Sequence, residues 1–351
     1  MRQGADNGNG DIFIAPMGGG YASGPEIITS TGRVVWFHAV PAGEIATDFR
    51  TQTYRGRPVL TWFQGRGLSG TDYIYNDRYQ QIAEVRAGNG YLTDFHEFLI
   101  TPWNTALILA DTMGTANLTS IGGPADQKVF DGIVQEIDIR TGKVLFQWNS
   151  ADHVPYRDSH QPLPGSAAVP WDWFHINAVH LDTDGNLLIN SRYTWTTYKV
   201  NRHTGKIIWE LGGKQSTFKL TAAPGQVLDG ATEIFAFQHD PEAIGNGEYT
   251  LFDDESDGPT TLLAHSRVVT VKLDLATRVA TLVKSVNQPE GLVAPAEGNA
   301  QTTGNGDLFV GWGALPYISE FSPSGRLLLN AQLPAGTNTY RAYRLPWHPA
   351  S

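Results

Sequence analysis

The sequence predicts an all-β fold, a six-bladed β-propeller built as a single domain over residues 1–351. Short segments rich in Val, Ile, Leu, Tyr and Trp alternate with turns, and helical periodicity is scarce. A turn of a small residue, a glycine and a basic residue recurs before an apolar segment, roughly every 45 to 70 residues, the spacing of propeller blades with insertions. Its clear copies are Thr31–Val34, Thr141–Val144, Thr204–Ile207 and Ser324–Leu327, and its degenerate copies are Asp77–Gln81 and Ala276–Val279.

The most regular repeat unit runs from His175 to Gly212 and predicts four antiparallel strands, which is one blade. Its expected strands are 175–181, 187–192, 195–201 and 206–211. The longer segments 151–170 and 212–231 are expected to be loops on one face, where loops commonly shape a binding site. The expected blades are 11–40, 46–88, 91–150, 171–212, 235–286 and 298–333, with a closing strand at 339–347 that joins both chain ends in one blade.

Composition limits the function. The formal net charge of −10 argues against nucleic acid or an anionic membrane as partner, and an anionic substrate would need a local cationic pocket. The absence of cysteine excludes disulfides, thiolate catalysis and cysteine metal sites. No apolar run is long enough to cross a bilayer, so membrane insertion is not expected. Oligomeric state stays open.

Three segments place a histidine just before an expected first strand: Phe95–Phe98, Phe174–Asn177 and Phe237–Asp240. Each is followed by a turn signal, and a fourth copy, Gly298–Gln301, carries amides instead of the histidine. The first strand of each propeller blade lines the central channel. The histidines are therefore expected to converge at the channel mouth.

Arg192 should join this group. It lies 17 residues after His175, and a hairpin of that length returns beside its start. His96, His175, Arg192 and His239 are thus predicted neighbours.

Several collinear segments resemble the arylsulfotransferase-like family, which is similar to the periplasmic arylsulfate sulfotransferases. The resemblance implies a six-bladed propeller, sulfuryl transfer without a nucleotide donor, and a secreted or periplasmic mature chain. Met1–Asp6 contains no apolar segment, so a signal peptide is expected to have been removed. The matching segments are Asp94–Phe98, Trp171–Asn177, Asn190–Trp195, Leu211–Lys214, Gln238–Asp240, Gly298–Gln301, Gly311–Gly313 and Tyr340–Arg344.

The resemblance also implies site roles. His239 corresponds to the nucleophile that forms a sulfohistidine in a ping-pong reaction, with His96, His175 and Arg192 as the other catalytic residues. His175 or His96 would move protons, and the Arg192 guanidinium would stabilise the sulfuryl oxygens. The expected substrate-binding residues are Trp173, Phe174, Asn177, Tyr193, Trp195 and Gln301, the aromatic ones by stacking against an aryl ring.

Two other functions fit the same residues. The propeller could be a polysaccharide lyase, in which Arg192 neutralises a uronate carboxylate and a histidine or Tyr193 abstracts the C5 proton for β-elimination. It could also be a non-catalytic propeller that binds a glycan or an aromatic compound. The expected partner is therefore a small aryl sulfate and a phenol, or a glycan.

No cofactor is expected. Zinc at the three histidines is disfavoured by the adjacent Arg192, whereas a structural calcium in the channel stays open. The acidic run Asp253–Gly258 predicts a solvated turn rather than a calcium loop, because position twelve is Ala264. His180 and His203 are expected at the surface. Structural roles are expected for His38, His153, His160, His265 and His348.

Overall fold

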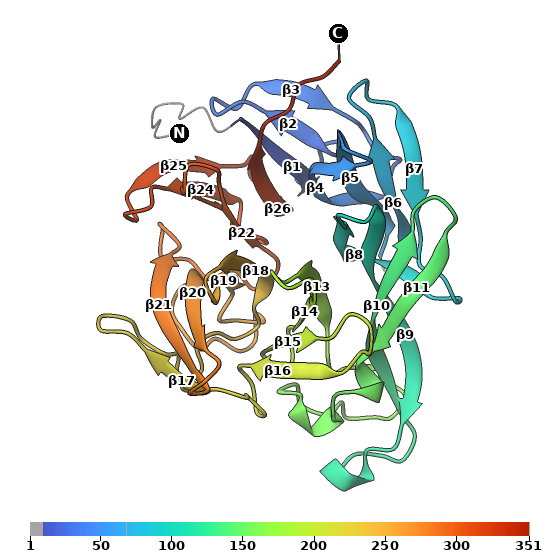
Figure 1. The fold of residues 1–351 in the computed structure, drawn as a ribbon, viewed down its shortest axis with the longest axis vertical. Helices are drawn as coiled ribbons and strands as arrows, with labels where there is room; N and C mark the ends of the chain where they lie inside the picture. The colour runs from blue at the N-terminus through green and yellow to red at the C-terminus, as the bar shows by residue number, and fades with distance from the viewer. Residues whose placement is uncertain (1–9, 68, 351) are drawn as a thin grey trace.

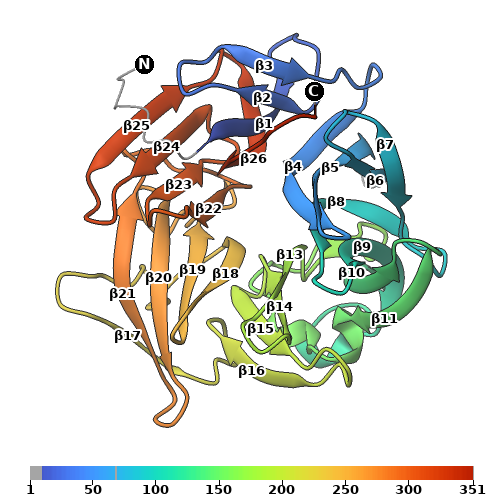
Figure 2. The same cartoon turned by 45° about the horizontal axis from the view of Figure 1, so that its top comes forward.

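The protein is a disc of six β-sheets arranged around a central axis (Figures 1 and 2). The computed structural model describes residues 10–67 and 69–350. The segment 1–6, whose lack of an apolar stretch led us to expect that a signal peptide had already been removed, lies outside these residues. The six-bladed β-propeller is confirmed. Within the described residues no helix has the length and apolar character that a bilayer span requires.

Each sheet is one blade. In the lists that follow, the strands of each blade are given from the one nearest the axis to the outermost one. The blade that contains both chain ends has β26 (Thr337–Leu345), β1 (Asp11–Gly18), β2 (Glu26–Ile28) and β3 (Val34–Phe37). The next two have β4 (Ile45–Tyr54), β5 (Arg57–Arg66), β6 (Ser69–Tyr75) and β7 (Gln81–Val85), then β8 (Leu92–Ile100), β9 (Thr105–Ala116), β10 (Gln127–Asp138) and β11 (Lys143–Asn149), with β12 (Trp171–Asp172) beside β10.

The remaining three blades follow the same order. Their strands are β13 (Ile176–Leu181), β14 (Leu187–Ser191), β15 (Thr196–Val200) and β16 (Ile207–Leu211); β18 (His239–Gly245), β19 (Glu248–Asp253), β20 (Arg267–Asp274) and β21 (Val279–Asn287), with β17 (Lys219–Ala222) outside β21; and β22 (Asn299–Thr302), β23 (Leu308–Gly311), β24 (Tyr317–Phe321) and β25 (Leu327–Gln332). The helical segments described are three 3-10 turns, η1 (Thr119–Ile121), η2 (Ser150–Asp152) and η3 (Tyr156–Asp158).

The recurring basic turn marks one position in every blade. All six copies lie between the third and fourth strands, from the β2–β3 turn to the β24–β25 turn. In the most regular blade, the four strands start and end within one residue of the predicted bounds. The segment 212–231 is not only a loop, because it adds β17 in parallel to β21. The segment 151–170 carries η3 and leads into β12, which pairs in parallel with β10.

Four of the innermost strands are bulged where they reach the channel. The register shifts between Thr47 and Arg50 in β4, between Thr93 and Phe98 in β8, and likewise in β13 and β18. Asp48, His175 and Asp240 adopt left-handed backbone with φ of 50° to 52°, which costs a non-glycine residue about 1–2 kcal/mol each. Bulges re-aim side chains, so adjacent residues of one strand can both serve the channel.

Below the channel mouth, buried charged side chains from different blades form an ion-pair network that we call the hub. His180 Nε2 of β13 lies 2.9 Å from Glu97 Oε2 of β8 and 3.4 Å from Asp240 Oδ1 of β18. Arg341 Nη1 of β26 lies 2.9 Å from Glu97 Oε2 and 3.6 Å from Asp240 Oδ1. The prediction that His180 lies at the surface is wrong; nothing in the local sequence shows that its strand faces a charged axis.

The hub reaches all six blades. Asp48 of β4 accepts from Arg341 at 3.2 Å and pairs with Arg50 at 3.1 Å. The Ala300 backbone N–H of β22 donates to Asp240 Oδ2 at 2.9 Å. Burial alone would lower the pKa of His180, but the charges of Glu97 and Asp240 override it and raise this pKa to about 10. Protonated His180 therefore supplies a third cation, beside Arg50 and Arg341, for three hub carboxylates.

Replacing His180 by glutamine should lower the free energy of unfolding at pH 7 by about 3–5 kcal/mol, because it removes one of the three cations that balance the three buried hub carboxylates. The folded pKa of about 10 exceeds the unfolded value of 6.5, so this stabilisation is full below pH 6.5 and is lost as pH rises through 10. Urea unfolding at pH 7 and pH 10 should show the gap between wild type and variant shrinking.

The exposed His203 offers a matched control. His203→Gln should change the free energy of unfolding by less than about 0.5 kcal/mol at either pH. A wild-type-to-His180→Gln difference that stays constant across this pH range would contradict a protonated His180 in the hub.

Candidate active site

The three predicted histidines meet at the channel, directly above the hub. His96 and His239 are each followed by a hub residue, Glu97 and Asp240, so the ion pairs fix the backbone next to both. The rings of His96 and His175 meet edge to face with centroids 5.3 Å apart. The predicted convergence of side chains that are far apart in the sequence is therefore what the fold produces.

Each imidazole is held by a carboxylate at Nδ1. His96 Nδ1 lies 2.5 Å from Asp94 Oδ1, and His175 Nδ1 lies 2.5 Å from Asp172 Oδ2. His239 Nδ1 lies 2.7 Å from Asp254 Oδ2. A carboxyl oxygen that faces Nδ1 can accept the hydrogen of that nitrogen, and in this tautomer Nε2 keeps its lone pair. The site thus presents three oriented imidazoles with a free Nε2.

Sequence reasoning missed these three carboxylates as site residues. Asp94 and Asp172 lie two and three residues before their histidines, so the spacing was a usable signal. Asp254 is 15 residues from His239 and reaches it only because β18 and β19 pair.

The three histidines differ in how far their side chains are buried. The side chains of His239 and His96 are 2% and 7% exposed, whereas that of His175 is 25% exposed. Burial, followed by the charge of Arg192, lowers the pKa of His239 well below its ordinary value. Burial also lowers the pKa of His96, against the opposing charge of Asp94. Both are neutral at pH 7, while His175 is the one in contact with solvent.

The carboxyl partner of His239 is also perturbed. Burial raises the pKa of Asp254 well above its ordinary value, and the nearby Arg192 opposes that rise. Arg192 therefore acts on both members of this pair: its charge lowers the pKa of His239 and opposes the rise of the pKa of Asp254.

Arg192 follows β14 and is tied to the site by its backbone and its side chain. Its backbone N–H donates to the His175 carbonyl at 3.0 Å, which is the predicted hairpin neighbourhood. Nη1 donates to the Tyr193 hydroxyl at 3.0 Å, and Nη2 donates to the carbonyl of Pro295. Its Nε is buried and, among the described residues, has no hydrogen-bond partner. The guanidinium is held rigidly and keeps one N–H free for a ligand.

Tyr340 is a further site residue that sequence reasoning did not single out. Its ring lies edge to face with His96 and His239, at centroid distances of 5.5 and 6.5 Å. The side chain is fully buried, and within the described chain its hydroxyl has no hydrogen-bond partner. Burial raises the pKa of Tyr340 well above its ordinary value, so the hydroxyl stays a neutral donor. Leaving it unpaired costs about 1–3 kcal/mol, which is typical of functional sites.

The aromatic residues predicted to stack on substrate divide into two groups. The Tyr193 ring lies 4.9 Å from that of His175 and borders the site. Trp195 stacks on His160 of the 151–170 segment at 3.6 Å and lies beside Phe237. Trp173 and Phe174 are fully buried in the hydrophobic core between two blades, so the structure does not place them as a stacking surface.

The two amides predicted to bind substrate instead connect inner strands. Asn177 is buried, donates to the Gln238 carbonyl at 2.9 Å and accepts from Asn190 at 2.6 Å. Gln301 donates to the Arg344 carbonyl at 3.0 Å and accepts from its N–H at 2.7 Å. The amide groups of both side chains are therefore used in hydrogen bonds within the scaffold.

The acidic run before Gly258 is also not the solvated turn that was predicted. Asp253, Asp254 and Glu255 are fully buried. Arg267 pairs with Asp253 at 2.8 Å and with Glu255 at 2.9 Å, while Asp254 serves His239. The run is part of the support of the site.

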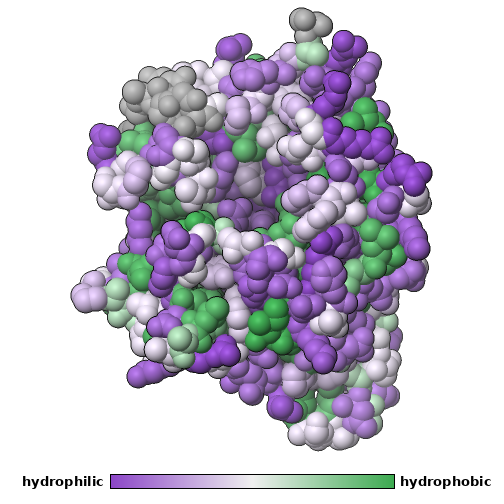
Figure 3. Space-filling view, viewed as in Figure 1, coloured by the Kyte–Doolittle hydropathy of each residue, from purple (hydrophilic) through white to green (hydrophobic). Residues whose placement is uncertain are grey.

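A metal would have one candidate position among residues 10–67 and 69–350. The ligand atoms of Glu97, His180 and Asp240 lie within 4.8 Å of one another. One of the three ligand atoms is an imidazole nitrogen, whereas calcium takes oxygen ligands, and Arg341 already brings positive charge to both carboxylates, so this donor set does not suit calcium. On the face in Figure 3 the disc is hollowed at its centre, among mainly hydrophilic side chains.

Comparison with known structures supports the architecture. A protein of unknown function from Bacteroides caccae is 13% identical, covers 95% of this chain and 99% of its own, and superposes with a TM-score of 0.58, which shows the shared fold alone. A catalytically inactive virginiamycin B lyase from Staphylococcus aureus is 8% identical, covers 94% of this chain and 86% of its own, and has a TM-score of 0.45. No curated protein sequence matches.

Comparison with sequence families is more specific. The protein-family model described as Arylsulfotransferase (ASST) matches residues 50–333, which is most of the chain. This span contains His96, His175, Arg192 and His239. Membership suggests arylsulfotransferase-type activity. The chain belongs to the Arylsulfotransferase (ASST) family.

Proposed function

We propose that the protein transfers a sulfuryl group from an aryl sulfate to a phenol through a sulfohistidine on His239. The observation that supports this most is the set of three imidazoles, each bonded to a carboxylate at Nδ1, beside a rigid guanidinium. Such a set offers a nucleophile, a proton carrier and an anion-binding group side by side.

His239 suits the nucleophile. Its lowered pKa keeps it neutral at pH 7, and Asp254 orients Nε2 as the lone-pair atom. In the first half-reaction Nε2 attacks sulfur, the S–N bond forms, and the bond from sulfur to the aryl oxygen breaks. His175, which is partly exposed and bonded to Asp172, takes a proton from solvent and gives it to the leaving oxygen.

The second half-reaction reverses these roles. A phenol enters after the first has left, and its hydroxyl proton passes to His175 Nε2. The phenol oxygen attacks sulfur, the S–N bond breaks, and His239 returns as neutral imidazole. Atoms and charges balance with no nucleotide. Tyr193, beside His175, is the ring against which either phenol can stack.

The sulfuryl oxygens need donors. Arg192 Nε–H and the Tyr340 hydroxyl are two buried donors near the histidines that have no hydrogen-bond partner among the described residues. Preorganised donors in a water-poor site stabilise the charge that develops in the transition state. Arg192 adds a permanent positive charge that suits an oxyanion in a protein of net charge −10.

Replacing His239 by alanine should reduce transfer at least about 10³-fold, because the covalent intermediate cannot form. The assay follows nitrophenol release from nitrophenyl sulfate, with and without a phenol acceptor, and wild type should turn over only with the acceptor. His203→Ala, on the surface, should keep wild-type turnover. Near-normal transfer by His239→Ala would remove His239 as nucleophile. Absorbance from unsaturated uronate, with no transfer, would favour the lyase.

Replacing Arg192 by lysine should lower transfer about 10²–10³-fold, since the three N–H donors of an ammonium leave one nitrogen and cannot span the Pro295 carbonyl and the sulfuryl oxygens as a planar guanidinium does. Arg202→Lys is the matched control. Arg202 binds Glu136 through two guanidinium nitrogens away from the histidines, so its change should affect stability and leave turnover intact. Wild-type turnover in Arg192→Lys would take Arg192 out of the mechanism.

Replacing Tyr340 by phenylalanine should lower transfer about 10²-fold but leave the protein as stable as wild type or up to about 1–3 kcal/mol more stable, because an unpaired buried hydroxyl is removed. Tyr198→Phe provides the contrast: its buried hydroxyl donates to Thr194 Oγ1 at 2.9 Å, so stability should fall and turnover should stay. Unchanged turnover with Tyr340→Phe would show that the hydroxyl does not touch the reacting group.

A further inference from the structure

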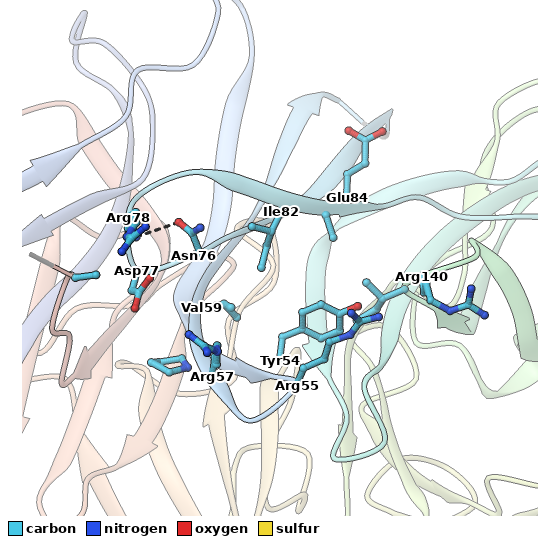
Figure 4. Close-up of a pocket in the computed structure, with 14 residues that line it drawn as sticks. Tyr54, Arg55, Arg57, Val59, Asn76, Asp77, Arg78, Ile82, Glu84 and Arg140 are labelled. Atoms are coloured by element: carbon cyan, nitrogen blue, oxygen red, sulfur yellow. Dashed lines mark hydrogen bonds between the residues drawn. The ribbon is translucent and has the colours of Figure 1, made fainter.

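A cavity of about 770 Å³ lies between the β4–β7 and β8–β11 blades (Figure 4). It is bordered by the β4–β5 turn, the β6–β7 turn and the end of β10. The histidine site lies at the end of the blades where the first strand begins and the second strand ends. Turns that join first to second and third to fourth strands lie at the other end of each blade. The cavity is therefore on the opposite face of the disc from the histidines.

Four arginines line this cavity in a protein with a net charge of −10: Arg55, Arg57, Arg78 and Arg140. All four are exposed. Within the described chain, none of their guanidinium groups has an ion-pair or hydrogen-bond partner, and Arg55 only stacks on Tyr54 at 5.1 Å. In Figure 4 the arginines spread along the cavity from Arg78 at one end to Arg140 at the other.

Two acidic residues line this cavity, and within the described chain neither forms an ion pair with any of the four arginines. Glu84 pairs with Arg86 at 3.2 Å, outside the cavity lining, and in Figure 4 its carboxylate points away from the four arginines. Asp77 is the one other carboxylate among the lining residues. Arg78 is anchored through its backbone N–H, which donates to Asn76 Oδ1 at 3.0 Å and leaves the guanidinium free.

The size and chemistry of the lining define a ligand class. A volume of 770 Å³ is within the usual range for small-molecule sites. Tyr54, Val59, Ile82 and Ile139 add apolar surface between the charges. Guanidinium groups bind sulfate, phosphate and carboxylate through paired N–H donors.

We propose that this cavity is a second binding site, for a small organic polyanion with two or more separated sulfate, phosphate or carboxylate groups. It is independent of the histidine site and of sulfuryl transfer. Several anionic groups are required because the arginines come from two blades and from both ends of the cavity.

Isothermal titration calorimetry with sucrose octasulfate tests the proposal, with neutral sucrose as the ligand control. The double variant Arg57→Gln/Arg140→Gln removes one arginine from each blade and should weaken binding about tenfold or more, since two charged contacts to the ligand are lost together. The matched control Arg33→Gln/Arg326→Gln removes the same charge from two exposed turns of other blades and should change binding less than about twofold.

Three further outcomes decide the proposal. His239→Ala should bind sucrose octasulfate as wild type does, because the ligand does not use the histidine site. If the two double variants weakened binding equally, the ligand would be responding only to the overall charge of the protein. That result, or no saturable binding at probe concentrations up to about 1 mM, would overturn the second site. Thermal unfolding of each variant checks that the fold is intact.

Discussion

The hub of buried ion pairs is the constraint on which the rest of the structure depends. A propeller needs a means of holding separate blades to a common axis, and here Glu97, His180, Asp240 and Arg341 come from four different inner strands. Ion pairs that are buried tolerate little displacement, because a lost partner leaves an uncompensated charge. The blades are therefore held at fixed positions around the axis.

The hub also explains why the active site is ordered. Glu97, Asp240 and Arg341 each follow a site residue, namely His96, His239 and Tyr340. Bulges and left-handed residues let neighbours on one strand serve the two layers, the hub below and the site above. The backbone strain at these positions is offset by the ion pairs. Stability and preorganisation of the site thus have the same physical origin.

The sequence could predict what repeats. The recurring basic turn indicated the number of blades. The position of the site was indicated by the histidines that precede first strands and by Arg192, which lies one hairpin after His175. Side chains whose partners lie on another strand or in another blade could not be placed from the sequence. His180 was expected at the surface and the Asp253–Gly258 run in solvent, because a polar residue on a short strand looks alike whether it faces water or a charged axis. Trp173 and Phe174 are buried in the core whereas Tyr193 borders the site, and this difference arises from tertiary packing that the local sequence does not reveal.

The central chemical claim is that His239 carries the sulfuryl group between two phenols. The most direct measurement is mass spectrometry of protein incubated with nitrophenyl sulfate in the absence of acceptor, then digested and mapped under conditions that preserve N-sulfonates. The account predicts one added sulfuryl group on the peptide that contains His239, lost when a phenol is supplied. An unmodified peptide during active turnover, or a sulfuryl group on another residue that leaves at the rate of transfer, would contradict it.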